Sequence, residues 1–159
     1  MQLKPIESFE VNHDLLQPGI YISRIDHVAE HPVTTFDIRC KRPNCGDFMP
    51  LDAMHTIEHL GATFFRNSAI KERIIYFGAM ACSTGFYLVA AGDYPPGGEA
   101  HKEMTELIME AWRFIAGFEG EIPGATRIEC GNYLAHDLPG AKKIAREFLD
   151  SPLEYIYRK

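Results

Sequence analysis

The sequence predicts an α+β domain of two layers, in which helices pack on one face of an antiparallel sheet. Residues 33–40 alternate apolar with polar or charged side chains, which is the pattern of a half-buried strand. Between residues 99 and 116, apolar side chains recur at helical spacing instead. Turn residues punctuate the chain, but no repeat or long linker divides it, so residues 1–159 are expected to form a single domain.

The first half of the chain is expected to begin with a β-hairpin. Residues 20–28 and 33–40 form its predicted strands, which are joined across a turn at 29–32. A Lys-Arg-Pro-Asn sequence ends the second strand, because proline has no N–H to donate to the sheet. A helix is then predicted over residues 52–66, with Asp52 as its cap.

The second half is expected to contain strands over residues 73–79, 84–91 and 126–130 and helices over residues 99–116 and 137–149. Cys82 lies in a tight turn between the first two of these strands. Asp137 and Pro139 favour the start of the last helix, since one is a good cap and the other fits the first turn.

Composition and charge exclude several classes of function. Sixteen Lys and Arg residues against 22 Asp and Glu residues give a net charge of −6, and we expect no nucleic-acid partner. The longest apolar stretch, residues 86–91, is far shorter than the ~20 residues that span a bilayer, and the first ten residues carry charges. We therefore expect no membrane span and no signal peptide. The four cysteines are then expected to be reduced in the cytoplasm and free for catalysis or metal binding.

The strongest chemical signal is the pentapeptide His55-Thr56-Ile57-Glu58-His59. Residues i and i+4 of a helix lie one above the other, so the two imidazoles face the same way about 6 Å apart and can share a metal. Glu58 lies on the adjoining edge of that face, where it can move protons without being a ligand. The order H-x-x-E-H is the reverse of the zincin motif. Two surface histidines on an amphipathic helix are the alternative explanation.

Two histidines leave such a site incomplete, because catalytic metal sites typically use three protein ligands. The cysteines and the remaining histidines are the candidates for the third. Cys40 and Cys45 are interpreted as an inward strand residue and a turn residue, because no second pair follows at zinc-ribbon spacing. Cys130 is expected at the end of a strand and Cys82 in a turn of small residues. Spacing alone does not separate either of them from a buried structural cysteine.

Five blocks of residues cover nearly the whole chain in order. They are Glu7-Ser8-Phe9-Glu10-Val11-Asn12-His13, Phe36-Asp37-Ile38-Arg39, His55-Thr56-Ile57-Glu58-His59-Leu60, Cys82-Ser83-Thr84-Gly85-Phe86-Tyr87-Leu88, and Glu129-Cys130-Gly131-Asn132-Tyr133 with His136-Asp137-Leu138. Together they resemble the S-ribosylhomocysteine lyase (LuxS) family, which produces the autoinducer-2 precursor in quorum sensing.

The resemblance implies a set of site residues and a metal. The implied metal ligands are His55, His59 and Cys130, the implied catalytic residues are Cys82 and Glu58, and the implied substrate-binding residues are Ser8, His13 and Arg39. One divalent ion per chain is expected, Fe(II) first and Zn(II) second. The resemblance also implies a homodimer whose active sites lie at the interface.

The implied reaction cleaves the thioether of S-ribosylhomocysteine to homocysteine and 4,5-dihydroxy-2,3-pentanedione. The thioether is lost only after a carbonyl has moved along the sugar to the position that makes the sulfur a β leaving group. Such an enzyme must transfer protons repeatedly, which a thiolate and a carboxylate can do. A metal would stabilise the negative charge that develops on oxygen.

The block around Cys82 departs from the family pattern. The family usually has G-P-M-G-C followed by Arg or Gln, whereas this chain has Gly78-Ala79-Met80-Ala81-Cys82-Ser83. The lack of a charged neighbour would leave the metal as the main positive potential at the sulfur. An alternative is therefore a lyase-derived metal-binding protein with altered substrate or little turnover. A reversed-zincin metalloprotease is a further alternative, although its downstream glutamate ligand has no counterpart here.

Overall fold

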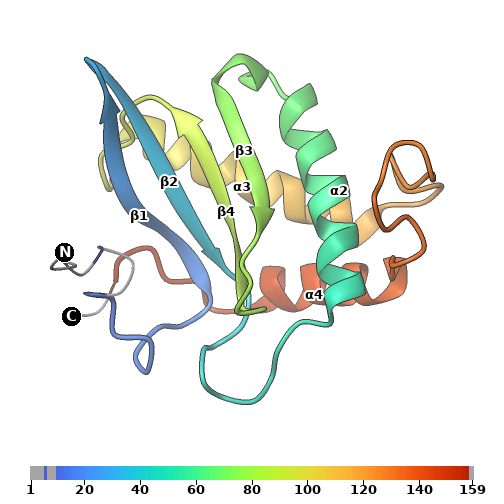
Figure 1. Cartoon of the computed structure of the whole chain (residues 1–159). Coiled ribbons are helices and arrows are strands. Elements are labelled where there is room, and N and C mark those ends of the chain that lie inside the picture. Colours follow the sequence, from blue (N-terminus) through green and yellow to red (C-terminus); the bar gives the residue numbers. More distant parts are fainter. Residues whose placement is uncertain (1–5, 7–9, 158–159) are drawn as a thin grey trace, which may run out of the picture.

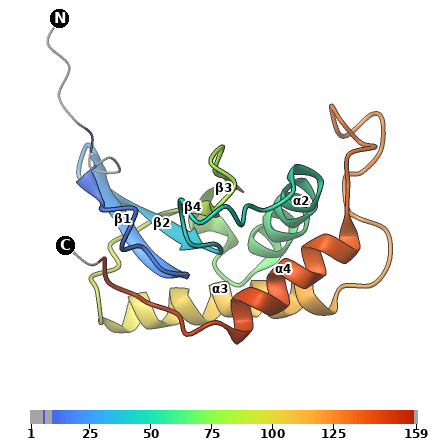
Figure 2. The ribbon, with the colours of Figure 1, turned by 90° about the horizontal axis from the view of Figure 1, so that it is seen from below.

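The computed structural model describes residue 6 and residues 10–157, which form one antiparallel sheet with three α-helices against it (Figure 1). In chain order the elements are β1 (Gly19–Val28), β2 (His31–Arg39), α2 (Leu51–Asn67), the short 3-10 helix η1 (Lys71–Arg73), β3 (Ile74–Ala79), β4 (Gly85–Ala91), α3 (Glu99–Gly117) and α4 (Leu138–Asp150). The helices lie on one side of the sheet (Figure 2). The predicted α+β class with helices on one face is confirmed.

The strands β1 and β2 form the predicted hairpin, although its turn is shorter than expected. Val28 pairs with His31, so only Ala29 and Glu30 lie in the turn. Ala29 has a φ of 55°, in the left-handed region that two-residue hairpin turns use. The sheet continues from β2 to β4 and then to β3, and every pairing is antiparallel.

The apolar face of the sheet and the helices share one core. Phe36 and Ile38 of β2 are fully buried, as the alternation of that strand predicts. The indole of Trp112 on α3 lies 5.9 Å from the ring of Phe86 on β4 and 5.2 Å from the ring of Phe148 on α4, measured between centroids. A single buried tryptophan therefore ties α3 and α4 to the sheet.

The two predicted helix caps have different outcomes. The carboxylate of Asp137 accepts a hydrogen bond from the N–H of Gly140 at 2.9 Å, so the cap of α4 is confirmed. The cap of α2 is Pro50, which makes no side-chain cap, and Asp52 lies inside the first turn of the helix. The prediction that Asp52 caps this helix is wrong, although a carboxylate in the first turn still interacts favourably with the helix dipole.

The predicted strand at residues 126–130 is wrong, because this segment forms consecutive turns. The N–H groups of Glu129 and Cys130 both donate to the carbonyl of Thr126, at 3.1 and 2.9 Å. The hydroxyl of Thr126 donates to the Glu129 carboxylate at 2.7 Å. Local hydrogen bonds of this kind compete with sheet pairing, and here they replace it.

The face of the sheet opposite the helices is polar, yet part of it is buried under the C-terminal segment. Asp37 and Arg39 of β2 lie on this face and are each only 3% exposed. The C-terminal segment runs beside β1 (Figure 1), where Glu154 bridges to Gly19 in parallel. The ring of Tyr157 stacks on that of Tyr21, with centroids 4.6 Å apart. The end of the described chain thus covers a charged pair.

Candidate active site

The helix α2 presents its two histidines on one side, as their i, i+4 spacing predicts. The ring centroids of His55 and His59 lie 4.7 Å apart, with the ring planes at 84°. Both side chains are partly buried, whereas Ile57 and Leu60 are fully buried on the core side. The apolar face of α2 therefore fixes the direction in which the imidazoles point.

Backbone carbonyls of the loop between α3 and α4 orient both rings. Nδ1 of His55 is hydrogen-bonded to the carbonyl of Ala135 and Nδ1 of His59 to that of Pro123, each at 2.8 Å. A carbonyl only accepts, so each Nδ1 carries the proton and each Nε2 keeps a lone pair. This is the second hydrogen bond that metal-ligating histidines usually make.

The thiol of Cys130 completes a three-residue donor set that fits a metal ion. Its Sγ lies 3.3 Å from Nε2 of His55, and the N–H of Asn132 donates to it at 3.4 Å. An ion bound tetrahedrally at usual metal–nitrogen and metal–sulfur distances would separate these two ligand atoms by roughly 3.5 Å. The cluster therefore matches a metal in both the chemistry and the spacing of its donors.

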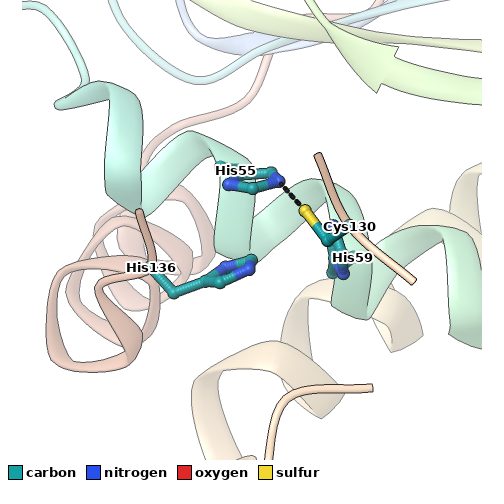
Figure 3. A group of neighbouring side chains, drawn as sticks. All are labelled: His55, His59, Cys130 and His136. Atoms are coloured by element: carbon teal, nitrogen blue, oxygen red, sulfur yellow. Dashed lines mark hydrogen bonds between the residues drawn. The ribbon is translucent and has the colours of Figure 1, made fainter. Parts of the chain in front are cut away.

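A fourth candidate ligand, His136, was not predicted from the sequence. Ligand atoms of His55, His59, Cys130 and His136 all lie within 4.8 Å of one another, and the four side chains point toward a common centre (Figure 3). The ring of His136 stacks on that of His55, with centroids 4.1 Å apart. Its sequence signals are its place in the last of the five family-like blocks and directly before Asp137, the cap of α4.

Hydrogen bonds around Thr56 fix the protonation of His136. The hydroxyl of Thr56 donates to the carbonyl of Asp52 and accepts from the N–H of Asp137, both at 2.9 Å. Nδ1 of His136, 3.3 Å from that oxygen, must therefore be the donor. Its Nε2 is buried without a hydrogen-bond partner in the described part of the chain. Burial, together with the imidazoles of His55 and His59, lowers the pKa of His136, which favours the neutral ring that binds metals.

A cavity of about 470 Å³ opens beside the cluster. Its lining includes His55 and Glu58 of α2, residues 79–81 at the end of β3, and Asn132 of the α3–α4 loop. This volume is in the range of small-molecule sites. Cys82 directly follows residues 79–81, so the turn that carries this thiol borders the cavity.

The thiol of Cys82 has a positive neighbour that the sequence did not reveal. Cys82 is exposed, and its Sγ lies 3.1 Å from Oγ1 of Thr84 and 3.8 Å from Nη1 of Arg39. The same Nη1 donates to Oγ1 of Thr84 at 2.6 Å. The expectation that a metal would be the main positive potential at this sulfur is therefore incomplete, because the Arg39 guanidinium lies beside it.

Arg39 is itself held in a buried network. Its Nη2 donates to Oδ2 of Asp37, which also accepts the hydroxyl of Tyr157 at 3.1 Å. Burial raises the pKa of Asp37, whereas Arg39 and Tyr157 counteract that rise. A small cavity of about 20 Å³ beside this network is lined by Arg39 and His13.

The structure brings the predicted site residues into two neighbouring groups. The metal-ligand candidates lie with Glu58, and the second group contains Cys82, Arg39 and His13. His13 lines the small cavity rather than the one beside the cluster. The remaining substrate-binding candidate, Ser8, lies outside the described residues.

A His and Cys cluster beside a carboxylate and an exposed thiol, on an α+β fold, defines a metal-binding enzyme. The sequence profile of the S-Ribosylhomocysteinase (LuxS) family matches residues 6–159. The chain belongs to this family.

Curated relatives extend over almost the full chain. The S-ribosylhomocysteine lyase of Phocaeicola vulgatus is 47% identical over 155 residues, which cover 97% of this chain and 93% of that protein. The S-ribosylhomocysteine lyase of Clostridium beijerinckii is 46% identical, with coverage of 99% and 96%. That of Porphyromonas gingivalis strain W83 is 44% identical, with coverage of 96% and 93%. Among the helices described, none has the length and apolar character needed to cross a bilayer.

Proposed function

We propose that this chain is a metal-dependent lyase that cleaves S-ribosylhomocysteine to homocysteine and 4,5-dihydroxy-2,3-pentanedione. The observation that carries the proposal is a cavity of small-molecule size and the residues that surround it. Glu58 and His55, one of the metal-ligand candidates, line it, and the turn that carries Cys82 borders it. Relatives that bear the name of this activity match the chain almost from end to end.

His55, His59 and Cys130 would hold one divalent ion, for which we propose Fe(II) first and Zn(II) second. When bound, the ion polarises a substrate oxygen and stabilises negative charge on it. The carbonyls of Pro123 and Ala135 keep the two imidazoles in the ligating orientation.

Glu58 and Cys82 would move the protons. Shifting a carbonyl along the sugar removes a proton from one carbon and returns a proton to its neighbour, so two groups that exchange protons near neutral pH are required. Once the sulfur is on the carbon β to the carbonyl, loss of the proton from the α carbon between them forms a C=C bond and breaks the C–S bond. Homocysteine then leaves as a thiolate, which is protonated on release. Nη1 of Arg39 lies 3.8 Å from Sγ of Cys82, where a hydrogen-bond donor can face the sulfur while it exchanges protons with the substrate.

The remaining roles follow from the same reaction. We propose that Ser8, His13 and Arg39 bind the substrate, and that the protein is a cytoplasmic homodimer with its active sites at the interface. Its products would serve autoinducer synthesis for quorum sensing and the recycling of homocysteine in the methionine cycle. The alternative is a lyase-derived metal-binding protein with altered substrate or little turnover. The residues on both sides of Cys82 favour it, because they depart from the family pattern.

The first prediction is that metal-loaded protein releases homocysteine from S-ribosylhomocysteine, measured as free thiol under anaerobic conditions. Glu58→Gln and Cys82→Ala should keep the metal and lose turnover by roughly 10²-fold or more, the size of a lost proton-transfer group. Cys45→Ala, which removes an exposed thiol far from these contacts in sequence, is the control and should retain activity. Fully loaded protein that releases no homocysteine would favour the alternative.

A further inference from the structure

We propose that Tyr157 is a positioning residue for the thiol of Cys82, and that it acts through the buried pair of Asp37 and Arg39. This inference rests on the proposed function, in which the Cys82 thiolate transfers protons. Tyr157 does not contact the thiol itself. Tyr157 would set the orientation of the Arg39 guanidinium, which lies beside the thiol.

The contacts run from the C-terminal segment across the outer face of the sheet to the β3–β4 turn. The hydroxyl of Tyr157 and Nη2 of Arg39 donate to the same oxygen, Oδ2 of Asp37. Nη1 of the same guanidinium lies 2.6 Å from Oγ1 of Thr84 and 3.8 Å from Sγ of Cys82. Because the guanidinium is planar and rigid, the position of the Asp37 carboxylate determines how Nη1 faces the sulfur.

The charged pair has few other partners that could hold it. Oδ1 of Asp37 and Nε of Arg39 are buried and have no hydrogen-bond partner among the described residues. Both residues are only 3% exposed, so bulk solvent does not reach the pair. The Tyr157 hydroxyl is therefore one of the two donors that keep the Asp37 carboxylate in place.

The ring of Tyr157 is held independently of its hydroxyl. It stacks on Tyr21 at an interplanar angle of 7°, and Glu154 bridges the same segment to β1. The hydroxyl of Tyr21 donates instead to the carbonyl of Gln17, at 2.9 Å. Tyr157→Phe should therefore keep the segment in place and remove the bond of the hydroxyl to Asp37, together with its hydrogen bond with Ser23. Tyr21→Phe removes a hydroxyl from the same stack without touching Asp37, and is the matched control.

The experiment measures the alkylation rate of Cys82 by iodoacetamide at fixed neutral pH, followed by mass spectrometry of the peptide that contains it. This rate reports the reactivity of the thiol and needs no substrate. We expect Tyr157→Phe to slow it roughly threefold to tenfold, the scale of one lost hydrogen bond, and Tyr21→Phe to leave it unchanged. We also expect Tyr157→Phe to lower kcat for homocysteine release by a similar factor. Circular dichroism and Tm establish that both variants are folded.

An unchanged alkylation rate in Tyr157→Phe overturns the proposal. Equal slowing in both variants also overturns it, because the effect would then come from packing of the stack and not from the bond to Asp37. Absence of homocysteine release by the unmodified protein counts against the proposed function alone, since the alkylation rates still decide the role of Tyr157.

Discussion

Single residues in the metal cluster depend on the backbone of a loop that has no regular secondary structure. The carbonyls of Pro123 and Ala135 select the tautomer of the two α2 histidines, and Thr56 selects that of His136. Metal-ligating histidines often donate to carboxylates, whereas here the acceptors are two carbonyls and a hydroxyl. Because these acceptors carry no net charge, they add less negative potential to the cluster than carboxylates in the same positions would.

Cys130 is the residue whose loss should affect metal binding most. It supplies the only sulfur among the four candidate ligands, and in the ligand set predicted from the sequence its loss leaves two neutral imidazoles, which bind metals weakly. Cys130→Ala should therefore lower the metal content of protein purified without chelator by roughly tenfold or more. Elemental analysis measures the content, and Cys45→Ala should keep it. Full occupancy in Cys130→Ala would show that His136 replaces the thiolate, and that the sequence-based ligand set is wrong.

At the scale of the elements, the helix α2 packs closely against the strand β3 beside the site. A Cβ atom added at Gly61 of α2 would lie only 2.4 Å from the ring of Phe77 on β3. That ring cannot easily move, because it stacks on Phe86 with centroids 5.4 Å apart. The absence of a side chain at residue 61 thus allows the helix that carries the histidines to approach the sheet.

Gly61→Ala should accordingly destabilise the fold. Overpacking of this kind costs about 1–3 kcal/mol, and the helix propensity of alanine returns at most about 1 kcal/mol. Gly117→Ala at the end of α3 is the matched control, since an added Cβ there meets no atom within 4 Å. Thermal unfolding should show a lower Tm for Gly61→Ala and an equal or higher Tm for Gly117→Ala. Equal values for both would mean that the contact with Phe77 relaxes without cost.

Periodicity predicted the regular elements well but not the outer face of the sheet. The alternation in β2 assigns Asp37 and Arg39 to a polar face, from which exposure would follow, yet both are buried and Asp37 is bonded to Tyr157 of the C-terminal segment. The contact between Tyr157 and Asp37 joins residues 120 positions apart, which no local pattern records.

The sequence-based prediction also failed for the loop between α3 and α4. Its turns are held by backbone hydrogen bonds from Glu129 and Cys130 and by contacts with α2, so the apparent strand around Ile128 was misleading. The helical spacing of His55 and His59 could be read from the sequence alone, whereas His136 required the tertiary structure.

On the scale of the whole molecule, several large apolar side chains near the site face solvent. Leu51 lines the large cavity and is 71% exposed, and Leu134 and Ile128 of the α3–α4 loop are 79% and 97% exposed. His13, by contrast, lies on the other side of the sheet from the helices, beside Arg39. We propose that a second copy of the chain covers these side chains and brings its own N-terminal residues to the site, whereas the described His13 lies beside Arg39 of its own chain.

We therefore expect a two-fold homodimer whose active sites draw residues from both chains. Inactive His13→Ala and inactive Cys82→Ala proteins should regain activity when their subunits are exchanged. Random exchange makes half of the dimers mixed, and one of two sites in each is intact, so about a quarter of the native activity is the upper value. Light scattering measures the mass independently. A monomer at micromolar concentration would contradict this arrangement.

The position of the candidate ligands along the chain has a thermodynamic consequence for the fold. His55 and His59 lie in α2, whereas Cys130 and His136 lie in the irregular loop that precedes α4. An ion bound to both acts as a reversible crosslink that the unfolded chain cannot form with the same affinity, so binding and folding are linked. Each tenfold rise in free metal above the dissociation constant then adds about 1.4 kcal/mol to the free energy of unfolding. The supply of metal would set the lifetime of the protein as well as its catalytic competence.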